Sequence, residues 1–170
     1  MKLTVPILFA AAALCGHGIA IATPHSAHLH YMVGVRAQAA TRHAAMLHQE
    51  AVDPALDLTL ARENAIEMSR LAGEIGDWLI LIGAAQVPEE LAQIKPEFAA
   101  MDESARAARV LSDQLLSKLD ETLEASSATG QAAPPEILRL QIGSACRQLF
   151  ARFQAILKAH KEAEQKLGIP

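Results

Sequence analysis

The chain has 170 residues with a formal net charge of −4, and this acidic balance argues against nucleic-acid binding, which needs a basic face. Only 4% of the residues are aromatic and Asn-Gly hairpin turns are absent, whereas alanine, leucine, glutamate and arginine are abundant. This composition excludes a β-rich protein and predicts an all-α fold.

The first 22 residues have the features of an export signal. Lys2 gives a short positive region, residues 5–14 are apolar but too few to span a bilayer, and Ala20-Ile21-Ala22 matches a cleavage site. We therefore expect a periplasmic or secreted protein whose mature chain is one domain, residues 23–170, with no membrane span. Removal of Lys2 changes the net charge from −4 to −5.

Four long helices are predicted in the mature chain, over residues 27–51, 54–82, 96–126 and 135–167. Asp53-Pro54 is typical of a helix start, and Gly83 is expected to stop the second helix. The connection that follows includes a turn around residues 88–92. Long amphipathic helices with short or moderate links predict an up-down-up-down four-helix bundle.

Apolar residues at alternating spacings of three and four mark the side of a helix that faces a bundle core. In the second helix they are Ala61, Ala65, Met68, Ala72, Ile75, Leu79 and Ile82. In the third helix they are Phe98, Met101, Ala105, Ala108, Leu111, Leu115 and Leu119.

The last helix contains the most informative segment, residues 142–153, which read Ile-Gly-Ser-Ala-Cys-Arg-Gln-Leu-Phe-Ala-Arg-Phe. This segment resembles the C-terminal helix of the cytochrome c-prime family, Val-Gly-x-x-Cys-x-x-Cys-His-x-x-Phe. Cys146 matches the first cysteine and Phe153 the trailing aromatic residue. Leu149 and Phe150 replace the second cysteine and the haem-ligating histidine. A third helix that starts with Lys-Pro-Glu at residues 95–97 adds to the resemblance.

The resemblance implies a four-helix bundle that binds haem, transfers electrons and pairs as a homodimer through its first two helices. Covalent haem needs two thiols and an imidazole, so we expect none here, and Cys146 is a vestige of the motif. We expect Leu149 and Phe150 to fill the former haem cavity, buried against the other helices. Cys146 is interpreted as a small buried hydrophobe, with a thiol metal ligand or an intermolecular disulfide as alternatives.

Histidines are concentrated near the start of the mature chain, at positions 25, 28 and 30. The inward side of the first helix is predicted to carry His25, His28, Met32, Val35, Ala39, His43 and Met46, with His30 and His48 off it. The inward side of the last helix is predicted to carry Cys146, Phe150, Phe153, Leu157 and His160.

In an up-down-up-down bundle the end of the last helix returns to the start of the first. His25, His28 and His160 are therefore predicted to share a transition-metal site, with Met32 as a soft additional ligand that suits copper.

Sequence patterns of enzymes are missing: acidic residues lie on outer helix faces, and there is neither a Glu-x-x-His pair nor a glycine-rich phosphate loop. We therefore expect no enzyme, but an exported copper-binding module. The alternatives are non-covalent haem binding with electron transfer, and a bundle without a ligand that serves a structural role or binds a protein partner of unknown kind.

Overall fold

The computed structural model describes residues 24–129 and 135–169, and within them the side chains of residues 27–128 and 135–169. The predicted signal at 1–22, its cleavage and the side chain of His25 lie outside this part. The described residues form helices joined by turns and contain no strand, which confirms the all-α prediction. The helices are α1 (Pro24–Glu50), α2 (Leu58–Ala85), α3 (Pro88–Gln93), α4 (Lys95–Thr129) and α5 (Glu136–Leu167).

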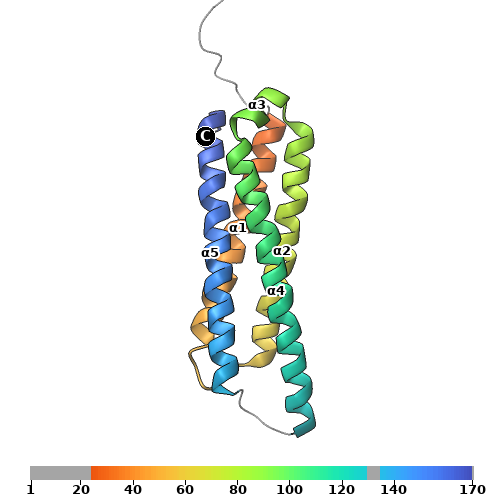
Figure 1. Ribbon diagram of the computed structural model, residues 1–170, viewed down its shortest axis with the longest axis vertical. Helices are drawn as coiled ribbons and strands as arrows, with labels where there is room; N and C mark the ends of the chain where they lie inside the picture. Colours follow the sequence, from red (N-terminus) through yellow and green to blue (C-terminus); the bar gives the residue numbers. More distant parts are fainter. Residues whose placement is uncertain (1–23, 130–134, 170) are drawn as a thin grey trace, which may run out of the picture.

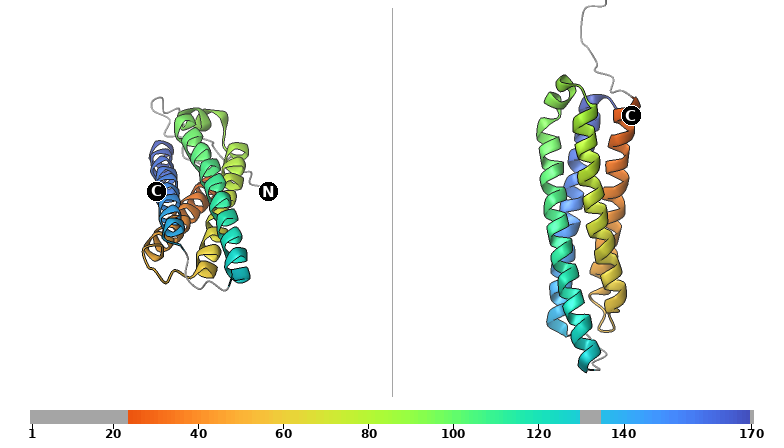
Figure 2. Two further views of the ribbon diagram at one scale, coloured as in Figure 1. Left: turned by 60° about the horizontal axis from the view of Figure 1, so that its bottom comes forward. Right: turned by 90° about the vertical axis from the view of Figure 1, so that its right-hand side faces the viewer.

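The four long helices lie side by side along one axis (Figure 1). Helix α1 packs against α2 and α5, and α4 packs against the same two helices, so the core runs lengthwise between them (Figure 2). The short α3 packs on α4 and α5. It lies at the end of the molecule where α1 begins and α5 ends (Figure 1).

Helix α2 starts and stops at different residues from those predicted. Its N-cap is Asp57, whose Oδ1 accepts hydrogen bonds from the backbone N–H groups of Thr59 and Leu60 (2.8 and 3.2 Å). Asp53 instead accepts from Ala55 in the preceding turn, so the helix does not begin at residue 54. Helix α2 also continues through Gly83 to Ala85, because packing outweighs the modest cost of one glycine in a helix.

The predicted inward sides of α2 and α4 agree with the structure. All seven residues named for α2 are buried. In α4, Phe98 and Leu111 are half-buried at the edge of the core, and the other five are buried. Both helices carry large apolar side chains at a clear helical spacing, and such a pattern fixes which side of a helix turns inward.

The predicted inward side of α1 is wrong. His28 is exposed, Met32, Val35, Ala39 and His43 are only half-buried, and Met46 is 51% exposed. The buried residues of this helix are Leu29, His30, Val33, Ala37, Ala40, Ala44 and Leu47. Alanine occurs on several sides of α1, so the sequence pattern only weakly distinguishes two neighbouring rotations of the helix, and packing against α2 and α5 selects the other one.

Helix α5 follows its prediction only in part. Cys146, Phe153 and His160 are buried, and the predicted burial of Leu149 is confirmed. The predicted burial of Phe150 is wrong, because this ring is 40% exposed. Leu149 lies seven residues, about two helical turns, from both Ile142 and Ile156, which are fully buried, whereas Phe150 lies one position further round the helix, at the border with solvent.

Candidate histidine site

Two buried histidines meet at the end of the molecule where α1 begins and α5 ends. His30 comes from α1 and His160 from α5, with 0% and 6% of their surfaces exposed. Their ring centroids are 5.9 Å apart and the rings are tilted by 45°. Histidine is rarely this buried without a polar partner, so the surroundings of the two rings determine their chemistry.

Each ring has one close hydrogen-bond partner. The side-chain nitrogen of Gln86, the C-cap residue of α2, donates to Nε2 of His30 (3.1 Å). Nε2 of His160 donates to the backbone carbonyl of His30 (2.5 Å), and its Nδ1 lies 3.5 Å from the carboxylate of Glu164. Three helices therefore converge on this pair of imidazoles.

Two polar atoms at this site are buried without a hydrogen-bond partner among the described residues. They are Nδ1 of His30 and Oε1 of Gln86. Leaving such atoms unpaired costs about 1–3 kcal/mol each. Buried groups of this kind call for an explanation, such as a ligand, a water molecule or an ion.

The electrostatic environment keeps His30 uncharged at neutral pH. Burial and the neighbouring His160 lower the pKa of His30 to about 4, although the hydrogen bond from Gln86 acts in the opposite direction. A neutral imidazole retains a lone pair, which is the form that binds metal ions.

Gly34 allows α1 and α5 to approach each other at His160. A Cβ atom at Gly34 would lie 2.9 Å from Cε1 of the His160 ring, which is closer than normal contacts permit. Because His160 is buried and hydrogen-bonded to His30, its ring has little room to move aside.

We expect Gly34→Ala and Gly76→Ala to have opposite effects on stability. Alanine gains about 0.5–1 kcal/mol over glycine inside a helix, and at Gly76 no atom lies within 4 Å of the new Cβ. At Gly34 the clash with His160 costs about 1–3 kcal/mol. Gly76→Ala should therefore raise the melting temperature and Gly34→Ala should lower it, as thermal unfolding followed by circular dichroism can measure. Equal shifts of the melting temperature for the two variants would mean that the His160 ring moves aside without a cost in stability.

The residues predicted to form the metal site are not all brought together. His160 is at the expected end, but His28 is exposed and lines a hollow beside Trp78 and Leu81 of α2. The sulfur of Met32 accepts a hydrogen bond from Arg36 (4.0 Å), and Arg36 in turn is paired with Glu74 of α2. His28 and Met32 thus lie against α2, whereas His160 approaches α1 from α5.

His30 is the functional candidate that the sequence prediction missed. A signal for it was present, because His30, Val33, Ala37, Ala40, Ala44 and Leu47 follow one another at spacings of 3-4-3-4-3. This is as regular as the set that was predicted, and it includes the two large apolar residues Val33 and Leu47, which are now found in the core.

The residues at the positions of the haem motif do not fit covalent haem. Leu149 has no thiol and Phe150 has no atom that ligates iron. Cys146 is fully buried, and burial, with a smaller contribution from Glu50, raises its pKa to about 12, so it stays a thiol. A sulfur with no exposed surface is also unsuited to an intermolecular disulfide. Cys146 packs as a small apolar side chain.

Within residues 24–129 and 135–169, no three histidine, cysteine, aspartate or glutamate side chains are grouped so that they could hold a metal ion, so His30 and His160 form a pair. None of the helices in this part combines the length and hydropathy needed to cross a bilayer.

No family model matches the chain, and no curated protein or solved structure is similar enough to it to count as a match.

Proposed function

We propose that this chain is an exported up-down-up-down four-helix bundle, of the cytochrome c-prime kind but without covalent haem, that binds copper through His30 and His160. The observation that carries the proposal is the pair of buried imidazoles, 130 positions apart in sequence, beside two unpartnered buried atoms. The chain around this pair supplies neutral nitrogen ligands at an end of the bundle that three helices enclose.

A metal ion on Nδ1 of His30 would provide a partner for that buried nitrogen. Rotation of the Gln86 amide by half a turn lets its oxygen accept from the Nε2–H of His30, which leaves Nδ1 deprotonated with a free lone pair. A histidine that binds a metal through one nitrogen commonly donates its other ring N–H to such an acceptor. Gln86 would then orient the ligand rather than bind the ion.

The second imidazole, when its ring is neutral, also has one nitrogen available to a metal ion. Nε2 of His160 donates to the His30 carbonyl, so in the neutral ring Nδ1 carries the lone pair. Nδ1 lies 3.5 Å from the Glu164 carboxylate, so two hydrogen-bond acceptors face each other. A cation bound there removes the repulsion between them. Imidazole suits copper, zinc and nickel, and Cu(II) binds most tightly in the general order of divalent metals.

The bundle topology and the export of the protein are parts of the same proposal. The contacts of α1 with α2 and α5, and of α4 with the same two helices, support an arrangement in which neighbouring helices alternate in direction. The signal pattern at residues 1–22 supports export.

A second candidate function, binding of a protein partner, is favoured by the outer face of α2. Near its C-terminal end, Ile80 is 71% exposed and Leu81 is 48% exposed, and Val87 follows with 48% exposed. Apolar side chains gathered at one place on a surface are typical of interaction sites. Such a face would suit the homodimer that the resemblance implies.

Calorimetric titration with copper tests the proposed site. We expect His30→Ala and His160→Ala to weaken copper binding by at least about 100-fold, since each removes one of two protein ligands. Copper should also raise the melting temperature of the parent, because the ion binds the folded bundle better than the open chain. His28→Ala, which alters an exposed histidine only two residues from His30, is the matched control and should bind like the parent.

The opposite pattern would overturn the proposal. If His28→Ala or His25→Ala abolishes binding while His160→Ala does not, copper is held by the histidine-rich start of the chain and not by the bundle. A visible spectrum after addition of haem distinguishes the haem alternative, because ligated haem gives a Soret band that copper does not.

A further inference from the structure

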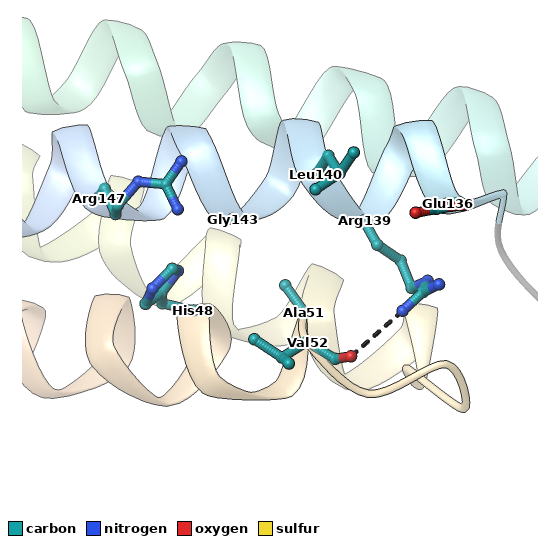
Figure 3. A pocket seen from close by; sticks show the side chains of 8 residues that line it. All are labelled: His48, Ala51, Val52, Glu136, Arg139, Leu140, Gly143 and Arg147. Atoms are coloured by element: carbon teal, nitrogen blue, oxygen red, sulfur yellow. Dashed lines mark hydrogen bonds between the residues drawn. The ribbon is translucent and has the colours of Figure 1, made fainter.

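A pocket of about 240 Å³ lies at the other end of the molecule, between the last turn of α1 and the first turns of α5. Figure 3 shows His48, Ala51 and Val52 on one side, facing Arg147 and Gly143 of α5 on the other. Neither the histidine pair nor Cys146, Leu149 or Phe150 lines this pocket.

The polar side chains of the pocket have unused hydrogen-bonding capacity. Nδ1 of His48 and Nε of Arg139 are buried with no hydrogen-bond partner among the described residues. Nη1 of Arg139 donates to the backbone carbonyl of Val52 (3.2 Å), which holds the guanidinium beside the end of α1 (Figure 3). The exposed Arg147 makes no hydrogen bond or ion pair within the described part of the chain.

The charge of the lining favours a ligand with one negative charge. Arg139 and Arg147 contribute two positive charges and Glu136 one negative charge, so the pocket carries a net charge of +1 when His48 is neutral. Glu50, next to Ala51 in the chain, is an acid whose pKa is raised by burial and by Asp57. A doubly charged anion such as phosphate would exceed the positive charge available, whereas a monoanion balances it.

The rest of the lining is apolar and suits a hydrocarbon body. Ala51, Val52 and Leu140 contribute carbon surface, and Val52 and Leu140 are 72% and 66% exposed. Gly143 adds no side chain, so the α5 side of the pocket stays open. With roughly 30 Å³ for each water-sized group, the pocket accommodates a molecule of about eight non-hydrogen atoms.

We propose that this pocket binds a small monocarboxylate with an apolar body, whose carboxylate accepts hydrogen bonds from Arg147. Arginine presents paired N–H donors that match a carboxylate, and such charge-assisted bonds are about twice as strong as neutral ones. His48 supplies a further ring nitrogen beside the guanidinium of Arg147 (Figure 3).

Isothermal titration of the parent protein with benzoate tests the proposal, with benzyl alcohol and inorganic phosphate as comparison ligands. We expect benzoate to bind, and benzyl alcohol and phosphate to bind at least about tenfold more weakly. Arg147→Gln should weaken benzoate binding by about tenfold or more. Arg152→Gln, an exposed arginine of the same helix outside the pocket, is the matched control and should bind like the parent.

A second variant tests the cavity without a change of charge. A Cβ at Gly143 would meet only ordinary contacts with His48 and Ala51, at 3.6 and 3.9 Å, so Gly143→Ala fits the fold and takes up part of the pocket. Benzoate binding should be weakened while the melting temperature is maintained. No benzoate binding by the parent, stronger binding of phosphate, or equal affinities for Arg147→Gln and Arg152→Gln would each overturn the proposal. None of these outcomes affects the copper site at the opposite end.

Discussion

Replacing Phe153 with alanine should lower the free energy of unfolding by about 3–5 kcal/mol, the usual range for removing a buried phenylalanine ring. Phe153 has none of its surface exposed and is the largest of the fully buried side chains in the described core. It lies on the same side of α5 as Cys146, Leu149 and Ile156, which are also fully buried. The cavity left by the ring could not close without moving a helix.

Phe150 provides the matched control, because it is the same residue type on the same helix. Its ring is 40% exposed, so Phe150→Ala should cost less than about 1 kcal/mol. Urea denaturation of the three proteins measures both differences from the midpoints, provided that the slopes agree. A larger loss for Phe150→Ala than for Phe153→Ala would place Phe150 in the core and restore the interpretation that it fills a former haem cavity.

Acid should weaken the fold through His30, by on the order of 3 kcal/mol between pH 6.5 and pH 4. The pKa of His30 is about 4 in the folded protein, whereas the unfolded chain has the ordinary value of 6.5. Between these two pH values the unfolded chain binds a proton that the folded chain does not. Stability is therefore unaffected by this group above pH 6.5, falls as the pH decreases, and levels off below about pH 4.

The variant His30→Gln isolates this contribution, because glutamine does not titrate and retains a polar side chain beside Gln86 and His160. Urea denaturation of both proteins at a series of pH values should give a smaller loss of stability for the variant between pH 6.5 and 4. Acidic groups with lowered pKa values, Glu67 and Glu97, are present in both proteins and cancel in the comparison. Parallel pH profiles would show that His30 is not kept neutral by burial.

The inward sides of α2 and α4 were predictable because their large apolar residues repeat at a single helical spacing. Met68, Ile75, Leu79 and Ile82 of α2 cannot be exposed together without a large loss of buried apolar surface. The helix ends were less predictable. Both Asp53 and Asp57 are good cap residues, and only the path of the connection selected Asp57 as the N-cap of α2.

The candidate site was predicted only in part, since His160 lies where expected but its partner is His30 and not His28. Two sets of residues on adjacent sides of α1 both repeat at spacings of three and four. Because α1 contains many alanines, burying either set yields a similar free energy. No sequence pattern predicts the pocket between α1 and α5, because His48, Arg139 and Arg147 are residue types that commonly lie on protein surfaces.

The sequence by itself determined that the described chain is all-α, which sides of α2 and α4 face inward, and that Cys146 and His160 are buried on α5. Those features follow from local propensity and from periodic apolar residues, which act along one helix. Only the tertiary structure decided the rotation of α1, the burial of His30, the exposure of Phe150 and the position of His48 beside Arg147. The rotation of α1 and the burial of His30 depend on how α1 packs against α2 and α5, and α5 approaches α1 closely at Gly34 beside His160. These contacts join residues that lie far apart in the sequence, so no pattern within one helix predicts them.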